Sequence, residues 1–407
     1  MRRVVITGIG AVTPLGSLFQ YAWKQVKAGV TGLAAMTRFD AGDMPWKIAG
    51  EVKGFIAEQY LSAKEMRRLD PFVHYAVAAA TEAFKDAGLS STLPPSASYM
   101  EFSGRSGVVI GSGRGGISYI EKALLRTEQA RVSPYLMPSS TICMAASFVA
   151  RKLGINGHCL GISNACASGT NAVGEAFRLI RHGYSDMVLA GGTEAPLCRL
   201  CVEGYGVSGA LSISAGPGAS RPFDIDRDGF ILSEGACVLV LEEYESAVKR
   251  NADIYAEIAG YGNTTDAFHI TRPDMKGEAA AILAAMKDAG LEASDVDYVN
   301  AHGTSTQIGD KTEAAAIREI LGSRVPVGSI KSMTGHMLAA SGAFETACTA
   351  MSLKEGVIPP TINLKQKDPE CDINVITTKT EADIKTAICS SFGFGGVNAV
   401  LALRRAY

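Results

Sequence analysis

Cys166 is the residue of this chain whose surroundings best suit nucleophilic chemistry. It stands in the segment Gly161–Thr170, whose small residues let a substrate come close to the backbone. The apolar run 159–162 leads into it, and a helical pattern of apolar residues follows and ends near Gly183. We therefore place the thiol in a strand-to-helix turn, where the N–H groups at the helix start favour the thiolate.

Two histidines lie far downstream in loops of similar composition. His302 belongs to Asn300–Thr306, and His336 ends the segment Lys331–His336; both segments are rich in Gly, Ser and Thr. A single histidine in such a loop is more often structural than catalytic. A thiol at a helix start combined with two such histidines, however, indicates covalent catalysis on an acyl group.

A fourth segment, Ser391–Asn398, completes a recognisable pattern. In this order and at this spacing, the four segments resemble the β-ketoacyl-acyl-carrier-protein synthases. These are the decarboxylating condensing enzymes of the thiolase superfamily, and the similarity is greatest to the type II elongating enzymes. The resemblance runs from Val4–Gly10 to the end of the chain. It implies an α/β chain with the five-layered αβαβα thiolase-like fold, built from two duplicated halves that meet at the active site.

The sequence itself shows a sign of this duplication. Phe84–Leu89 and Met286–Leu291 share five of six residues, at an offset of 202 positions, and each ends an Ala-rich helical stretch. We predict an N-terminal half, residues 1–250, that carries Cys166, and a C-terminal half, residues 251–407, that carries both histidines.

Short apolar runs between helical patterns predict buried strands. Such strands, alternating with helices, indicate sheets that are covered on both faces. We expect strands at Val4–Thr7, Gly107–Ile110, Met187–Ala190, Ala236–Leu241, Val299–Ala301 and Ala399–Leu403.

Composition excludes several other classes of protein. With 47% hydrophobic and 20% charged residues and a net charge of −2, the chain is an ordinary globular protein with no general affinity for nucleic acid or anionic membrane. No apolar run reaches the ~18 residues of a membrane helix. Met1–Arg3 leads into a strand without the apolar stretch of a signal peptide, so we expect a cytoplasmic protein whose nine cysteines are reduced.

Two segments resemble ligand sites without meeting their requirements. Gly111–Gly116 has the spacing of a dinucleotide-binding loop but lacks a clear βαβ context and a distal acidic residue. The carboxylates of Arg221–Phe230 are spaced by two, but no glutamate closes a calcium loop, so ion pairing is the better interpretation. We expect no metal and no cofactor, since the substrates would carry the phosphopantetheine of acyl carrier protein.

The resemblance assigns the chemical steps to particular residues. Cys166 would hold the acyl group as a thioester, with the backbone N–H groups of Cys166 and Phe394 as its oxyanion hole. His302 and His336 would face the malonyl thioester as neutral imidazoles and stabilise the enolate left by loss of CO2. Which of the two handles a proton stays open.

Four further residues match supporting positions of the family. Lys331 would fix the histidine loop and the local field, and Glu313 would pair with Lys331 or order water. Thr304 and Thr306 match hydroxyls that bind the phosphopantetheine arm, although each could equally cap its own turn.

The resemblance therefore implies a 3-oxoacyl-[acyl-carrier-protein] synthase, an acyltransferase of the β-ketoacyl-ACP synthase II type, acting in fatty acid elongation. One alternative is the ketosynthase subunit of a type II polyketide or aryl-polyene system, paired with an inactive chain-length partner. A non-catalytic partner subunit is disfavoured because Cys166 is present. Thiolases place a second cysteine inside the Gly-rich loop, where Phe394 stands here; Cys389 lies just before that loop.

Two residues depart from the family pattern. Arg114 stands where an apolar residue commonly lines the acyl tunnel, and Tyr205 stands where a Phe is common. A buried guanidinium needs a partner, so we expect a tunnel that is shorter, more polar or capped by a charge pair.

Basic residues match the family's positions for docking acyl carrier protein, which is the expected partner. A homodimer is the expected assembly, and a heterodimer with a chain-length partner is the alternative. A solvated helix face explains the first three docking positions equally well. The candidate docking residues are Lys64, Arg67, Arg68 and Arg131.

Overall fold

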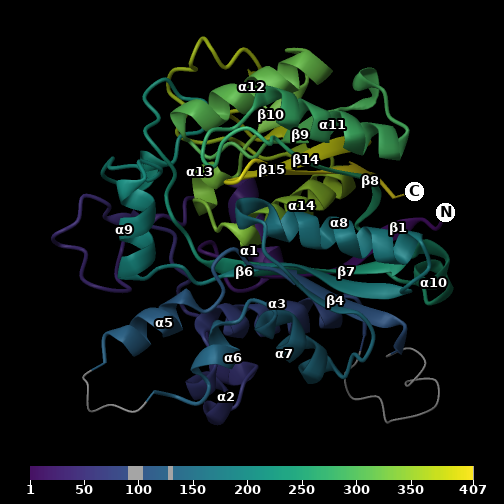
Figure 1. Cartoon of the computed structure of the whole chain (residues 1–407). Helices are drawn as coiled ribbons and strands as arrows, with labels where there is room; N and C mark the ends of the chain where they lie inside the picture. Colours follow the sequence, from purple (N-terminus) through teal and green to yellow (C-terminus); the bar gives the residue numbers. More distant parts are fainter. Residues whose placement is uncertain (90–103, 127–131, 407) are drawn as a thin grey trace.

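Five layers of secondary structure are stacked in the computed structural model, which describes residues 1–89, 104–126 and 132–406 (Figure 1). Helices α3 (Pro71–Asp86) and α7 (Met144–Leu153) cover one outer face. Helices α8 (Ser168–Arg181) and α14 (Ala339–Glu355) form the central layer, and α11 (Met275–Ala289) and α12 (Gln307–Leu321) cover the other outer face. The predicted αβαβα arrangement is confirmed.

The two sheet layers are the two arms of one hydrogen-bonded sheet. The arms join where residues 4–6 of β1 pair with residues 256–258 of β8. The first arm has the order β5-β4-β6-β7-β1 and the second β12-β10-β9-β14-β15-β8. The strands are β1 (Val4–Val12), β4 (Ser106–Gly111), β5 (Cys159–Ile162), β6 (Met187–Glu194), β7 (Gly235–Glu243), β8 (Ala256–Thr265), β9 (Tyr298–Asn300), β10 (Pro326–Gly328), β12 (Asn374–Val375), β14 (Thr386–Gly393) and β15 (Val397–Arg404).

Both arms repeat one topology. Leaving out β12, each arm orders its strands third, second, fourth, fifth, first along the chain, with two parallel pairs followed by two antiparallel pairs. The repeated sequence segments end α3 and α11 and make the same contact. Asp86 accepts the N–H of Ile9 on β1 at 2.8 Å, and Asp288 accepts the N–H of Tyr261 on β8 at 3.1 Å. The internal duplication is therefore structural; the division at residue 250 stays a prediction.

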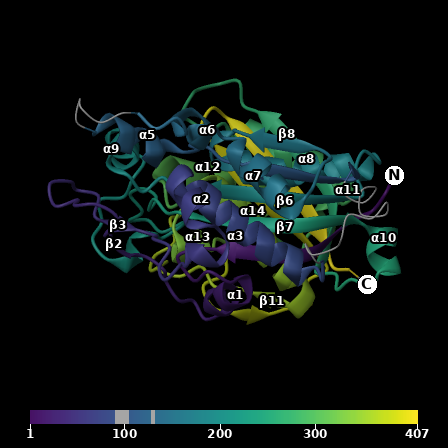
Figure 2. The same ribbon diagram turned by 90° about the horizontal axis from the view of Figure 1, so that it is seen from below.

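Shorter elements complete the described chain. Seen from below, α2, α3 and α7 lie over the first arm of the sheet (Figure 2). The remaining elements are α1 (Phe19–Lys27), α2 (Ala63–Arg68), α5 (Ile117–Leu124), α6 (Leu136–Ser140), α9 (Arg199–Val207), α10 (Tyr244–Lys249), α13 (Lys331–Thr334), and two small sheets, β2 (Ala34–Ala35) with β3 (Ile48–Ala49) and β11 (Val357–Ile358) with β13 (Thr380–Glu381).

The apolar runs identified part of the large sheet. Every strand predicted from an apolar run is present, and most extend beyond the run; β8, β10, β12 and β14 of the large sheet were not predicted. Helix α14 lies between the sheet arms, and all of its residues from Ala339 to Leu353 are buried. Within the described ranges, no helix is long and apolar enough to cross a membrane.

Candidate active site

Cys166 lies in the tight turn that the sequence predicted. The turn, residues 165–167, connects the end of β5 to the first residue of α8. Ala165 adopts a left-handed conformation with φ of 48°, which is strained for a residue with a Cβ. The Ser168 hydroxyl stabilises the turn by accepting the Asn164 N–H at 2.8 Å and donating to the Ala165 carbonyl at 2.6 Å. The nucleophile is thus held on a rigid corner.

Burial opposes the thiolate that the helix start favours. Only 8% of Cys166 is exposed, and burial raises the pKa of its thiol to about 11. The Lys331 and Arg114 cations lower the pKa of Cys166 but do not outweigh the loss of hydration. The thiol must therefore lose its proton during the attack.

This pKa predicts how Cys166 reacts with a small alkylating agent. Because the ordinary pH range lies below the raised pKa, each unit of pH should increase the thiolate fraction and the alkylation rate about tenfold. The measurement is the rate of iodoacetamide labelling of Cys166 by peptide mass spectrometry, across the range in which the fold is intact. A rate that levels off near neutral pH would contradict the raised pKa.

His302 follows β9 and is positioned through its backbone. The Glu313 carboxylate, on α12, accepts the N–H groups of His302 and Gly303, both at 2.7 Å. Lys331 donates to Nδ1 of His302 at 3.3 Å. Since an ammonium group offers only hydrogens, the proton of this imidazole lies on Nε2.

His336 is held by a different set of contacts. Its N–H donates to the Ile231 carbonyl at 2.8 Å, and its carbonyl accepts the Ser233 N–H at 3.0 Å. Its Nδ1 lies 3.2 Å from the Ser341 hydroxyl, which also accepts the Met337 N–H at 2.8 Å. A hydroxyl can donate or accept, so either tautomer of His336 is available. Its buried Nε2 has no partner within the described chain.

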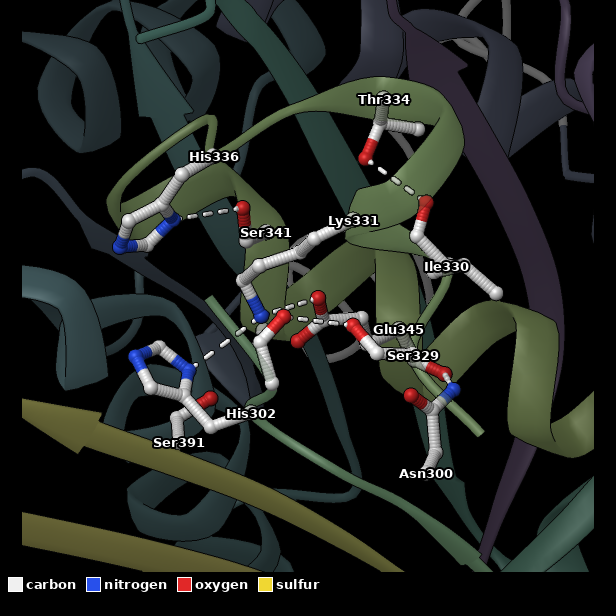
Figure 3. Close-up of polar contacts among 12 residues, drawn as sticks. Asn300, His302, Ser329, Ile330, Lys331, Thr334, His336, Ser341, Glu345 and Ser391 are labelled. Atoms are coloured by element: carbon white, nitrogen blue, oxygen red, sulfur yellow. Dashed lines mark hydrogen bonds and ion pairs between the residues drawn. The ribbon is translucent and has the colours of Figure 1, made fainter. Parts of the chain in front are cut away.

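The thiol and the two imidazoles meet at one point. One ligand-type atom of each of Cys166, His302 and His336 lies within 4.8 Å of the others, and the two rings are nearly perpendicular with centroids 5.2 Å apart. Figure 3 shows both rings on the same side of Lys331. Burial and the Lys331 charge hold the pKa of each imidazole well below its usual range, which favours the neutral form that the resemblance implies.

A cavity of about 390 Å³ leads to this point. Its lining includes all three groups together with Phe394, residues 302–304 and residues 306–310, so both halves of the chain contribute. Thr304 and Thr306 line it, with their hydroxyls 3.0 Å apart. This position suits the predicted contact with a polar substrate arm.

The same three groups form the one cluster of potential metal ligands found among the residues the structure describes. The Lys331 ammonium, bonded to His302, would repel a second cation. The arrangement therefore favours acyl chemistry; the absence of a metal or cofactor stays a prediction.

Lys331 does not pair with Glu313, so one of the two roles predicted for Glu313 is wrong. Lys331 is fully buried and forms an ion pair with Glu345 of α14 (Figure 3). Glu313 instead binds the two backbone N–H groups of the His302 loop, and burial raises its pKa to about 7. Glu313 fixes the loop, while the Lys331–Glu345 pair fixes the imidazole.

The Gly-rich loop between β14 and β15 brings Phe394 to the nucleophile. The Phe394 N–H hydrogen-bonds the Cys166 sulfur, so one of the two predicted oxyanion donors is in reach. A Cβ on Gly393 would lie 3.1 Å from the Asn164 carbonyl oxygen and 3.3 Å from the Cys166 nitrogen. This contact is so close that it favours glycine.

Arg114 and Tyr205, the two departures from the family pattern, contact each other. Arg114 Nε donates to the Tyr205 hydroxyl at 2.8 Å, and the guanidinium carbon lies 5.2 Å from the ring centroid. The Tyr205 ring packs 5.6 Å from Phe230 and 6.5 Å from Phe394, beside Cys166. The expectation that Arg114 is buried was wrong for this chain, because its side chain reaches solvent.

The predicted docking residues lie away from the cavity. Lys64 and Arg67 are exposed on α2, and Arg68 stacks over the ring of Tyr135 at 4.2 Å. None of these three basic residues lines the cavity. Arg131 lies outside the described residues.

Three site residues were missed from the sequence. Glu345 could have been found as the one charged residue within the otherwise uncharged stretch Ala339–Leu353. Ser341 follows His336 by five residues in that same stretch, but nothing local distinguishes it. Arg272 lines the cavity and is exposed; its loop carries no recognisable pattern.

Two family models match this chain. The model of the β-ketoacyl synthase N-terminal domain matches residues 1–247, and that of the C-terminal domain matches residues 255–365. The chain belongs to the β-ketoacyl synthase family. The match spans the Cys166 turn and both histidine loops, which are the segments that converge in the cavity.

Individual relatives agree with this assignment over the full length. The 3-oxoacyl-[acyl-carrier-protein] synthase 2 of Synechocystis sp. is 44% identical over 99% of this chain and 98% of its own. The crystal structure of a β-ketoacyl synthase from Burkholderia phymatum has a TM-score of 0.92 at 35% identity, with both chains fully covered. A type II polyketide ketosynthase in complex with its acyl-carrier protein has a TM-score of 0.89 at 34% identity, again with full coverage.

Proposed function

We propose that this β-ketoacyl synthase is a 3-oxoacyl-[acyl-carrier-protein] synthase that elongates an acyl chain by decarboxylative condensation with malonyl-acyl carrier protein. One observation carries the proposal: the Cys166 thiol and the His302 and His336 imidazoles converge within 4.8 Å in one cavity. No bound cofactor is needed, because every group in the scheme belongs to the protein or to its substrates.

The first half-reaction transfers the acyl group to the enzyme. The Cys166 sulfur attacks the thioester carbonyl while its proton passes to Nε2 of His336, the imidazole whose tautomer is not fixed. The Phe394 N–H, which already contacts the sulfur, stabilises the oxyanion. Collapse of the tetrahedral adduct expels the carrier thiolate, which takes the proton back from His336.

The second half-reaction forms the carbon–carbon bond. Loss of CO2 from the malonyl thioester leaves an enolate, whose oxygen accepts hydrogen bonds from Nε2–H of His302 and of His336. For this step His336 changes to the tautomer with its proton on Nε2, and the Ser341 hydroxyl then donates to Nδ1. The Lys331 contact keeps the His302 proton on that nitrogen. The enolate carbon attacks the acyl-Cys166 carbonyl, and the adduct releases the 3-oxoacyl product and the Cys166 thiolate, which takes up a proton from water to restore the thiol.

The direct test supplies the purified protein with acyl-acyl carrier protein and malonyl-acyl carrier protein. We expect an acyl adduct on Cys166 before malonyl thioester is added, and then one CO2 for each 3-oxoacyl product. Intact-protein mass spectrometry follows both stages. A protein that releases CO2 but never carries an acyl group would contradict the proposal.

Carrier docking and dimerisation are parts of the same proposal. Exposed Lys64 and Arg67 offer positive charge to an acidic carrier protein in the cytoplasm. For the homodimer, β5 lies at the edge of the sheet, and Leu160 on it is 43% exposed. An exposed apolar edge strand can pair with its copy. Leu160→Lys should therefore give monomers in analytical ultracentrifugation, while unchanged dimers would place the interface elsewhere.

A polyketide or aryl-polyene ketosynthase is the second candidate, and Arg114 is the observation that favours it. Its guanidinium, hydrogen-bonded to the Tyr205 hydroxyl, is near enough to lower the pKa of Cys166, and a charge at that distance is unsuited to a long saturated chain. The polyketide ketosynthase complex among the structural relatives is consistent with this candidate.

Arg114→Ile tests whether the guanidinium limits the length of the acyl chain. Removal of the guanidinium should move the acyl preference toward longer saturated chains, with a gain of about tenfold for one or two added methylene pairs. The measurement is kcat/KM over a series of acyl-acyl carrier proteins. Arg114→Lys, which keeps the charge, is the matched control. An unchanged length profile in the folded Ile variant would mean that Arg114 does not limit the pocket.

A further inference from the structure

Two cysteines beside the active site have no part in the proposed reaction. Cys198 and Cys201 are separated by Arg199 and Leu200, and so form a Cys-x-x-Cys pair at the start of α9. The expectation that the nine cysteines are merely reduced thiols overlooked this spacing. A Cys-x-x-Cys pair at a helix N-terminus is typical of thiols that exchange with disulfides.

The local geometry places the two sulfurs together. Cys198 has an extended backbone (φ −132°, ψ 161°) and its carbonyl accepts the Val202 N–H at 3.1 Å, so it stands directly before the first helical residue. Cys201 lies in the first turn of α9, three residues after Cys198, and both side chains pack in the same buried cluster. Because Cys198 lies outside the helix, its side chain can approach Cys201 without breaking helical hydrogen bonds.

The two thiols also differ in acidity. The hydrogen bond from Cys201 lowers the pKa of Cys198, while the same contact, together with burial, raises the pKa of Cys201. Such a difference separates an attacking sulfur from one that resolves the mixed disulfide. Cys198 is 4% exposed and Cys201 is 7% exposed. A small disulfide reagent can therefore reach the two thiols more easily than a disulfide in another protein can.

Helix α9 connects this pair to the nucleophile. Cys198 and Cys201 belong to the same packed cluster as Cys166, with Tyr205 and Phe394 against it. Tyr205 lies four residues after Cys201, and hence on the same face of the helix. Its ring packs near Phe394, whose N–H contacts the Cys166 sulfur. A change in the first turn of α9 would therefore reach the acyl pocket through Tyr205.

We propose that Cys198 and Cys201 form a reversible dithiol–disulfide site for low-molecular-weight disulfides, and that its oxidation slows acylation of Cys166. The second part rests on the proposed function; the first does not. The Cys198 thiolate attacks one sulfur of the external disulfide and expels a thiolate. The Cys201 thiolate then attacks the Cys198 sulfur, closes the internal disulfide and expels the second thiolate. The two electrons leave on the reduced reagent, and the two thiol protons go to water or to the expelled thiolates.

The chain offers a direct readout of this bond. Trypsin cleaves after Arg199, between the two cysteines, and so places them in separate peptides, His182–Arg199 and Leu200–Arg227. The full-length protein is equilibrated in glutathione buffers of increasing oxidised fraction, its free thiols are alkylated, and it is digested without reductant. We expect a cross-linked peptide pair that separates on reduction. No cross-link in buffers that oxidise dithiothreitol would overturn the site.

Acylation rates test the coupling. Oxidised wild-type protein should acylate Cys166 about tenfold or more slowly than reduced protein, because a small displacement of a positioning group costs up to about 10²-fold. Dithiothreitol should restore the rate. The double variant Cys198→Ser/Cys201→Ser keeps Cys166 and therefore reports any direct oxidation of the nucleophile. Its acylation rate should not fall under oxidising conditions. Cys143→Ser, which removes an exposed thiol, is the matched control and should respond like wild type.

The outcomes separate the two claims. If the cross-linked protein acylates Cys166 as fast as the dithiol form does, the coupling is overturned. If oxidation slows acylation equally in the double-serine variant, the effect belongs to Cys166 itself, and the coupling is again overturned. If the reduced protein does not acylate Cys166, the proposed function fails while the cross-link still decides the dithiol site. Should the double-serine variant not fold, Cys198→Ala alone removes the disulfide and serves in its place.

Discussion

Cys166→Ala should abolish transfer of an acyl group from acyl carrier protein to the enzyme and leave decarboxylation of malonyl-acyl carrier protein. The thiol is the only group at the convergence point that can form a thioester, whereas both imidazoles that stabilise the enolate remain. We expect condensation to fall by at least about 10³-fold, the scale on which loss of a nucleophile acts. Intact-mass detection of the acyl-enzyme and CO2 release measure the two activities separately.

Cys389→Ala is the matched control for this substitution. Cys389 is fully buried on β14, its sulfur accepts the Thr346 hydroxyl at 3.8 Å, and burial raises its pKa to about 12. It does not line the cavity. The variant should keep near-native condensation. If Cys166→Ala is acylated at the wild-type rate, Cys166 is not the nucleophile. If a folded Cys389→Ala loses condensation, the two-cysteine chemistry of a thiolase applies.

The parts of the site that are local in sequence could be predicted. The Cys166 turn lies between an apolar strand and an amphipathic helix, and those patterns are written in neighbouring residues. Two of the strands that were missed have mixed patterns. Gly260 and Gly262 interrupt β8, where they let α11 approach the strand closely, and adjacent serines, Ser390 and Ser391, interrupt β14.

The parts that depend on packing could not be predicted. Lys331 finds Glu345 because α14 passes beside the His302 loop, a contact that no spacing in the sequence encodes. The acidity of Cys166 follows from how deeply the turn is buried, and here desolvation outweighs the nearby cations. Tyr205 and Arg114 stand on different elements, so their hydrogen bond depends on how α9 packs against the loop after β4.

His302→Ala and His336→Ala should each lower malonyl decarboxylation by about 10²–10³-fold, because each removes one of two donors to the same enolate oxygen. Acylation separates the two. His302, whose Nδ1 accepts from Lys331, carries its proton on Nε2 and serves only as a donor, so His302→Ala should acylate Cys166 at a near-native rate. His336→Ala should also slow acylation, because it removes the group that takes the thiol proton. Equal acylation rates in the two variants would contradict this division of roles.

The acidity of the imidazoles supplies an independent check in the Cys166→Ala background. Burial and Lys331 lower the pKa of His302 and His336 well below 6.5, so each takes up a proton only at a pH more acidic than an ordinary histidine requires. Decarboxylation should therefore be level from about pH 8 down to about pH 6, because both donors keep the neutral form through that range. A fall centred near the ordinary histidine pKa would mean that the rings are hydrated in the working enzyme. A second variant tests the role of His302 directly. His302→Gln keeps an N–H donor but cannot transfer a proton. It should therefore retain more decarboxylation than His302→Ala if the role of the ring is to donate a hydrogen bond.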